Sequence, residues 1–221
     1  MIAADPTLLG PSVNWFALSP VLLLLGAAIL LLLVGAMAPR VPRHAYAMFT
    51  AAAGLATMIL CFFLWDNITD DGASTLVGGA LRFDVFTMFI TITIAAAVVL
   101  VALVTDDYLR REELEGPEVY ALYLLAAIGG VVMGSANDLI VLFLGLEILS
   151  IAMYVMAASH RKRIESQESG IKYFILGGFS SAFFLYGIAM VYGTAGSTNF
   201  SKIVDSFNTN VPAVRDRKSV V

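Results

Sequence analysis

The chain has 221 residues, of which 59% are hydrophobic and 14% are charged, with a formal net charge of −4. Soluble domains contain about 45–50% apolar and about 25% charged residues, so this composition indicates a membrane protein. The sequence contains no phosphate-binding loop, haem motif, metal cluster or nucleophile–base set, which excludes the chemistry of soluble enzymes. The single cysteine, Cys61, lies in an apolar run and is predicted to be a packing residue.

Six apolar runs are of about the length needed to cross a bilayer as helices. In chain order they are residues 16–38, 45–65, 83–104, 119–134, 139–158 and 170–192. Only Gly134–Asp138 separates the fourth run from the fifth, so these two helices are expected to be antiparallel neighbours. The predicted fold class is therefore an all-α polytopic membrane bundle with six transmembrane helices.

Three short signals refine the connections between these runs. Gly78 and Gly79 stand between apolar residues after the second run and predict a small hairpin. Pro117 is a favourable residue for the start of the fourth helix. Small residues would allow close helix contacts in the fourth run (AAIGGVVMG) and in the sixth, where they are Gly177, Gly178, Ser180 and Ser181.

Basic residues are distributed unequally between the two sets of connections. Those after the first, third and fifth runs hold seven, namely Arg40, Arg43, Arg110, Arg111, Arg161, Lys162 and Arg163. The amino-terminal segment and the connections after the second and fourth runs hold only Arg82. By the positive-inside rule, the amino terminus and the short turn 134–138 are predicted to face outward.

Glu147 is the one charged residue in the run Leu139–Ala158, nearly at its middle. An ionised side chain at that depth costs roughly 2.5–3.5 kcal/mol on insertion scales. It could be a structural carboxyl that is protonated or hydrogen-bonded to a neighbouring helix. Because packing alone does not explain a mid-membrane carboxyl, we favour a group of a proton pathway or the partner of an intramembrane cation.

Two further residues are candidates for a proton pathway, each with a simpler alternative. Lys172, near the start of the sixth run, either extends to the membrane surface or lies at the inner mouth of a pathway. A direct ion pair with Glu147 is not expected, because the two positions lie at different depths. His160 is either a solvated interfacial histidine or a relay, since imidazole titrates near neutral pH. Arg161–Arg163 is an orientation signal and a candidate lipid contact.

The segment EVYALYLLAAIGGVVMGSANDLIVLFLGLEILSIAMYVMAA, followed by ESGIKYFILGGFSSAFFLYGIAMVYGTAGSTNF, resembles the antiporter-like subunit N of proton-pumping NADH:quinone oxidoreductase, respiratory complex I. LRFDVFTMFI, before the third run, resembles it as well. The resemblance extends from about Leu81 to Phe207. Gly145-Leu146-Glu147 and Gly170-Ile171-Lys172-Tyr173 favour subunit N over subunits L and M and the Mrp-type sodium/proton antiporters, which usually carry a bulky aromatic residue before this glutamate.

The resemblance implies a role for Glu147, because it matches the family glutamate that pairs with a lysine on a broken seventh helix. Lys172 matches a lysine of the sixth helix whose role is less settled. The subunit itself carries no redox cofactor: NADH, FMN, iron–sulfur clusters and quinone belong to the rest of the complex. Its partners would be the other membrane subunits and lipid, not nucleic acid. Its location would be the bacterial plasma (inner) membrane, with the amino terminus outside.

The resemblance also divides the chain. Residues 1–104 would be three accessory helices, and residues 105–214 the first part of an antiporter-like repeat. Helices seven, eight and twelve of the family, with their lysines, are absent from this sequence. The ending DRKSVV is what a common sequencing adapter encodes when translated. Residues 215–221 are therefore predicted to be a non-native tail, and the native chain is expected to continue.

Three functions remain open from the sequence. The first is a membrane-arm subunit that translocates protons, coupled to electron transfer from NADH to quinone, as part of a translocase. The second is an Mrp-type antiporter subunit that exchanges sodium for protons. The third is a non-catalytic membrane assembly protein in which Glu147 is only structural.

Overall fold

The computed structural model describes residues 13–37, 42–112 and 116–209. Within these ranges six helices are long and apolar enough to cross a membrane, which confirms the predicted bundle. They are α1 (Ser19–Met37), α2 (Arg43–Asp71), α3 (Val85–Arg111), α4 (Glu118–Ser135), α5 (Leu139–Ala157) and α6 (Ile164–Ala195). The predicted tail at 215–221 and the first basic residue of the α1–α2 connection, Arg40, lie outside the described residues.

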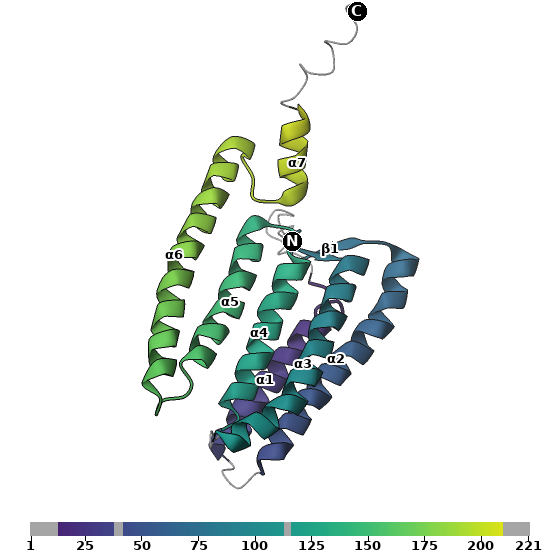
Figure 1. Ribbon diagram of the computed structural model, residues 1–221. Coiled ribbons are helices and arrows are strands. Elements are labelled where there is room, and N and C mark those ends of the chain that lie inside the picture. The colour runs from purple at the N-terminus through teal and green to yellow at the C-terminus, as the bar shows by residue number, and fades with distance from the viewer. Residues whose placement is uncertain (1–12, 38–41, 113–115, 210–221) are drawn as a thin grey trace, which may run out of the picture.

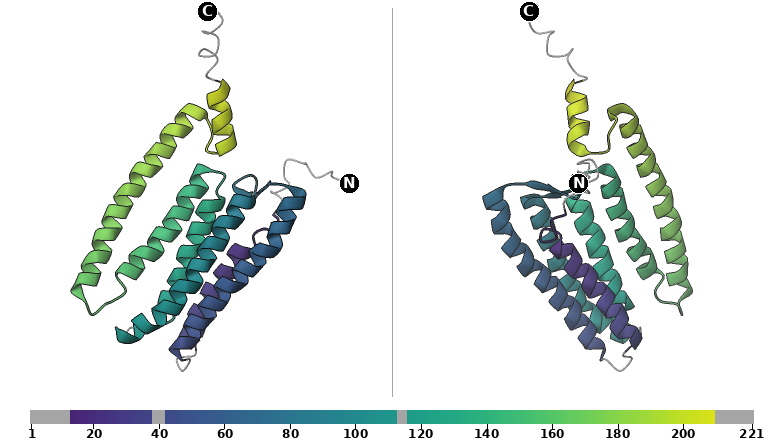
Figure 2. Two further views of the ribbon diagram at one scale, coloured as in Figure 1. Left: turned by 45° about the vertical axis from the view of Figure 1, so that its right-hand side comes forward. Right: turned by 180° about the vertical axis from the view of Figure 1, so that it is seen from behind.

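Helices α2, α3, α4, α5 and α6 stand side by side in a row, and α1 lies across one face of that row (Figures 1 and 2). Each helix of the row packs against its neighbour in sequence, as expected for antiparallel helices joined by short connections. α1 packs against α4 and α2 and so closes one face of the row. α6 stands at the edge, with α5 as its main helical neighbour in the row.

Three helices extend beyond their apolar runs. α2 continues to Asp71, and α3 includes residues 105–111, which the hydropathy pattern assigned to a connection. At the end of α3, Asp107 forms ion pairs with Arg110 and Arg111, three and four residues later. Such pairs, and arginines in a last turn, favour a helix. α6 begins at Ile164, six residues before its apolar run, so hydropathy marks the membrane portion of these helices rather than their ends.

The Gly78–Gly79 pair lies in a β-hairpin, which confirms that prediction. Strand β1 (Ser74–Leu76) pairs antiparallel with β2 (Leu81–Phe83), with Leu76 opposite Leu81. The turn needs left-handed backbone, with φ of 65° at Gly78 and 87° at Gly79. After β2, the Asp84 carboxylate accepts a 2.8 Å hydrogen bond from the Thr87 amide and caps α3.

The hairpin is joined to two other connections at the same end of the bundle, which we call the hairpin end. The Asn137 side-chain amide donates a 2.8 Å hydrogen bond to the Gly79 carbonyl. Asn199 donates to the Gly79 and Asn137 carbonyls at 3.2 Å each. The Thr198 hydroxyl donates to the Asp138 carboxylate at 2.6 Å. These bonds tie the α2–α3, α4–α5 and α6–α7 connections together.

After this network the chain forms α7 (Phe200–Thr209), which extends away from the bundle beyond the hairpin end (Figure 1). This helix was not expected from the sequence. It has ten residues, too few to span a bilayer, and polar residues interrupt it at every turn, so it carries no hydropathy signal. We call the opposite end of the bundle, which holds Arg110, Arg111, Arg161, Lys162 and Arg163, the basic end.

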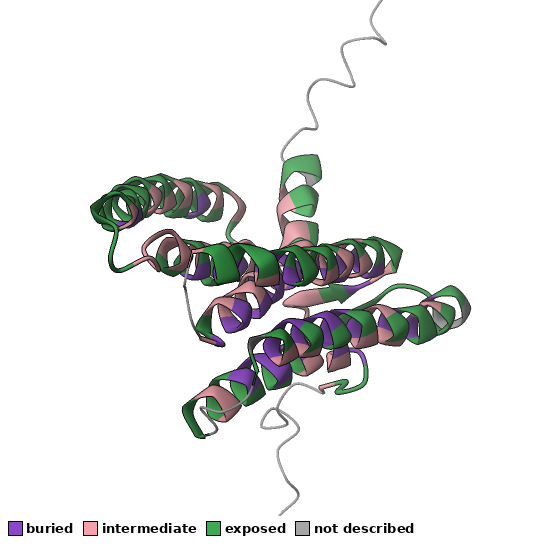
Figure 3. Cartoon of the chain, turned by 60° about the horizontal axis from the view of Figure 1, so that its bottom comes forward, coloured by how far each residue is buried: buried purple, intermediate pink, exposed green. Residues whose placement is uncertain are grey.

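The buried core lies within α1–α4. Figure 3 shows buried positions concentrated in that part of the bundle, whereas α6 is exposed along nearly all its length. The largest buried side chains include Tyr120 and Leu124 of α4, Leu24 of α1 and Leu64 of α2. The predicted packing role of Cys61 is confirmed, since its side chain is fully buried in α2.

Candidate functional site

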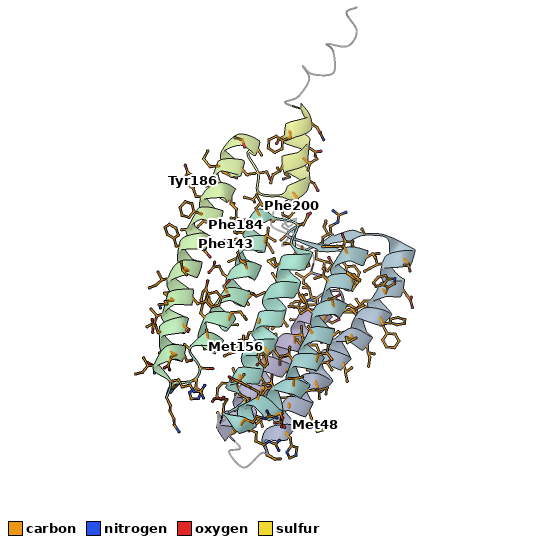
Figure 4. All side chains as sticks on the ribbon, viewed as in Figure 1. Met48, Phe143, Met156, Phe184, Tyr186 and Phe200 are labelled. Atoms are coloured by element: carbon orange, nitrogen blue, oxygen red, sulfur yellow. The ribbon has the colours of Figure 1, made fainter. Side chains whose placement is uncertain are left out.

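Glu147 lies in the middle of α5 and is half-buried at the contact with α6. The Ser181 hydroxyl of α6 donates a short hydrogen bond to its Oε1 atom. About one turn toward the hairpin end, the Phe143 and Phe184 rings contact each other between the same helices, with centroids 6.2 Å apart (Figure 4). A carboxyl at mid-membrane depth therefore has a polar partner on the adjacent helix and an aromatic pair beside it.

The register between α5 and α6 explains why Glu147 meets Ser181. Near the basic end, Gly170 packs against Ala158 so closely that an added β-carbon would lie 2.5 Å from the Ala158 β-carbon. Glu147 and Ser181 each lie eleven residues from this contact, in opposite chain directions. Two antiparallel helices with the same rise per residue bring such positions to the same level.

The opposite face of α5 packs against α4. Gly145 is two positions from Glu147, which in an α-helix is more than halfway around the axis. A β-carbon at Gly145 would lie 2.7 Å from the Met133 amide nitrogen and 2.9 Å from the Gly129 carbonyl oxygen. The predicted small-residue contact of the fourth run is thus confirmed as a backbone-to-backbone crossing with α5.

Tyr154 lies seven residues after Glu147, two helical turns closer to the basic end and on the same side of α5. Its hydroxyl occupies the space left by Gly177, where an added β-carbon would be 1.9 Å away. The Tyr173 and Phe174 rings pack edge-on against it, with centroids 4.9 and 5.7 Å from the Tyr154 centroid. Gly177 belongs to the predicted small-residue seam, whereas Gly178 has nothing within 4 Å of an added β-carbon.

His160 lies in the α5–α6 connection and is mostly buried. Of the two predicted alternatives, a solvated interfacial histidine therefore does not describe it. Its side chain is 16% exposed, with Nε2 3.7 Å from the Glu112 carboxylate at the end of α3. Arg163 approaches the same carboxylate oxygen at 2.6 Å. Glu112 thereby joins the α3 end to the α5–α6 connection, and a role for His160 in proton relay stays a prediction.

Lys172 forms an ion pair with Glu168 at 2.5 Å, one turn earlier on α6, and both side chains are mostly exposed. It lies nine residues from Ser181, or about 14 Å of helix rise, so the structure does not bring it to Glu147. Of the three candidates, only Glu147 is at mid-membrane depth. Lys172 and His160 both lie near the basic end.

Ser181 is a site residue that was not expected from the sequence. It was predicted only as part of a small-residue seam, because a serine in an apolar helix carries no signal of its own. The register would have identified it. Counting outward from the ends of the two apolar runs, Ala158 and Gly170, places Ser181 opposite Glu147.

The chain matches known proteins in both sequence and fold. A family model described as the transmembrane part of NADH:quinone oxidoreductase and Mrp antiporters matches residues 136–215, which include α5, α6 and α7. The fold is also similar to a chain of an archaeal membrane-bound sulfane sulfur reductase, with a TM-score of 0.71 over 86% of this chain. A chain of respiratory complex I from Thermus thermophilus gives a TM-score of 0.66 over 81% of this chain. Both are 24% identical in sequence and show the fold alone. The class is therefore that of antiporter-like membrane subunits.

Among curated proteins, NADH-quinone oxidoreductase subunit N of Jannaschia sp. (strain CCS1) is 37% identical over 208 residues, which cover 93% of this chain. The subunit N 2 of Koribacter versatilis is 32% identical over 205 residues. The chain belongs to the subunit N family of NADH-quinone oxidoreductases. It spans 40% and 42% of the lengths of these two relatives.

Proposed function

We propose that this chain forms part of a membrane-arm subunit that translocates protons, coupled to electron transfer from NADH to quinone. In this proposal NADH, FMN, iron–sulfur clusters and quinone are bound by other subunits. The basic end faces the cytoplasm of a bacterium, in accord with the positive-inside distribution, and the hairpin end faces outward. The observation that carries the proposal is the hydrogen bond between Glu147 and Ser181 in the middle of the membrane span.

A hydroxyl partner suits a carboxyl that must gain and lose a proton. Serine can donate to an ionised carboxylate, and it can accept from a protonated carboxyl after its own hydroxyl rotates. The contact is therefore retained in both protonation states of Glu147. A fixed cation would instead favour only the ionised form. No basic side chain forms an ion pair with Glu147 in the described ranges.

The route toward Glu147 from the basic end follows the α5–α6 contact. Tyr154 lies between the basic end and the level of Glu147. Its side chain points toward the amino-terminal end of α5, and therefore toward Glu147. His160 and Lys172 lie nearer to the basic end. We assign His160 to the mouth of this route, because it is held among Glu112 and Arg163. Lys172 is the second candidate for that mouth.

The test is proton translocation by the assembled complex in inverted membrane vesicles, with NADH as donor and quinone as acceptor. Glu147→Gln keeps the shape of the side chain and its contact with Ser181 but cannot carry a proton, so we expect proton transport per NADH oxidised to fall. Glu165→Gln, in the first turn of α6 and distant from Glu147, is the matched control and should not change it. An unchanged proton-to-electron ratio in Glu147→Gln would contradict the proposal and favour a structural role.

A further inference from the structure

Helices α4, α5 and α6 separate at the basic end and leave a cleft of about 1170 Å³. α5 ends at Ala157 and α6 begins at Ile164. Ser166 of α6 donates a 2.7 Å hydrogen bond to the Ala157 carbonyl, and Gly170 packs against Ala158. The connecting residues 158–163 all line the cleft. A volume of this size exceeds the roughly 300–1,000 Å³ that encloses a drug-sized ligand.

The described part of the rim carries more positive than negative charge. Among the described residues, its lining includes the four cations Arg111, Arg161, Lys162 and Arg163 and the two carboxylates Glu112 and Glu118. Arg163 pairs with Glu112, and Arg111 pairs with Asp107. For Arg161 and Lys162, the structure shows no ion pair with any residue it describes. Among the described residues, these two side chains are the rim cations that remain for a ligand.

The wall of the cleft beyond this rim is apolar. Val119 and Leu122 of α4 form one side, and Val155 of α5 with Ile171 and Phe174 of α6 form the other. Val155 is 50% exposed, Ile171 61% and Phe174 60%, so the described residues leave this wall uncovered. A free inorganic anion would contact only the basic rim, whereas a molecule with an anionic head and long hydrocarbon chains would contact both the rim and the apolar wall.

We propose that this cleft binds an anionic glycerophospholipid, with its phosphate at Arg161 and Lys162 and its acyl chains along the apolar wall between α4 and α6. Basic pockets between transmembrane helices are suited to such head groups on the cytoplasmic side. The bound lipid would fill the opening between α4 and α6 and support the edge helix. The cleft shares Tyr154 and His160 with the proposed proton route, but lipid binding at Arg161 and Lys162 is measured directly and does not depend on proton translocation.

The test uses the full chain in bilayers containing spin-labelled phosphatidylglycerol or spin-labelled phosphatidylcholine, and measures the fraction of each label that the protein immobilises. We expect selectivity for phosphatidylglycerol. Each rim cation should contribute about five-fold in affinity, so Arg161→Gln combined with Lys162→Gln should remove most of that selectivity. Arg110→Gln is the matched control, because Arg110 is an exposed cation at the same end that does not line the cleft. It should leave the selectivity unchanged.

A second variant tests the wall without altering charge. Val155→Trp keeps the wall apolar but fills the space, and it should lower the immobilised fraction of phosphatidylglycerol while circular dichroism shows an unchanged helix content. Equal immobilisation of the two lipids by the unmodified chain would overturn the proposal. So would a loss in Arg110→Gln as large as in the double variant, since binding would then reflect general surface charge.

Discussion

The two sides of α5 are built differently, although one helix carries both. Toward α4, glycine meets glycine, and the backbones of Gly145 and Gly129 contact each other directly. Toward α6, side chains fill the interface: Ser181 bonds to Glu147, and Tyr154 occupies the space over Gly177. In the most apolar stretch of α4, 50% of the residues are buried, whereas in the most apolar stretch of α6 only 6% are buried. α5 is thus held firmly on one side and has a looser, polar contact on the other.

The two contacts differ in how much change they tolerate. Backbone atoms in a close helix crossing have no rotamers with which to move away, so an added methyl group must push whole helices apart. A tyrosine hydroxyl or a serine side chain can rotate. A carboxyl that changes its protonation state needs such a neighbourhood. The proposed proton group therefore lies on the adaptable side of α5, against a helix with few other contacts.

We expect the largest loss of stability from a substitution at the close contact between α4 and α5. Gly129→Ala places a β-carbon 2.5 Å from the Leu149 amide nitrogen, and overpacking of this kind costs about 1–3 kcal/mol in the free energy of unfolding. Unfolding in mixed detergent micelles measures it. Gly26→Ala is the control, since nothing lies within 4 Å of that position and alanine favours a helix. Equal stability of the two variants would contradict the backbone crossing.

We expect a smaller loss of stability from a substitution at the contact between α5 and α6. Gly177→Ala places a β-carbon 1.9 Å from the Tyr154 hydroxyl, but the tyrosine ring can swing away, so we expect a loss of about 1 kcal/mol. The adjacent Gly178→Ala faces open space and is the matched control. The Tyr154 ring carbons Cζ and Cε1 also lie 2.5 and 2.8 Å from that β-carbon, so Gly177→Ala should destabilise a Tyr154→Leu background less than the unmodified chain, measured in the same unfolding experiment. An equal loss in both backgrounds would show that the Tyr154 side chain is not what fills that space.

The sequence could predict local features of this fold but not the contacts that depend on helix register. The six spans, the Gly78–Gly79 hairpin, the start of α4 after Pro117 and the close α4–α5 contact follow from hydropathy and glycine positions, because these are local or nearest-neighbour properties. The pairing of Glu147 with Ser181 depends on helix register, and the sharing of Glu112 by His160 and Arg163 depends on where α3 ends. Such contacts link residues tens of positions apart, and no local pattern encodes them. The helical ends of α3 and α6 were missed because charged residues extend both helices past their apolar runs.

The least loss of stability is expected at Ser181. Ser181→Ala removes one hydrogen bond from a carboxyl that is only half-buried, so we expect a cost near the lower end of the usual range, about 0.5 kcal/mol. If Glu147 exchanges protons, however, the same change should slow proton translocation in the assembled complex, because the hydroxyl that serves both protonation states is gone. Ser181→Thr restores a hydroxyl and should recover translocation. Ser180→Ala, the neighbouring serine with no hydrogen bond to Glu147, controls for the loss of a hydroxyl from α6. A Ser181→Ala variant that is less stable but translocates at the normal rate would assign the bond to helix packing alone, and α5 would then have two structural sides rather than one structural and one functional.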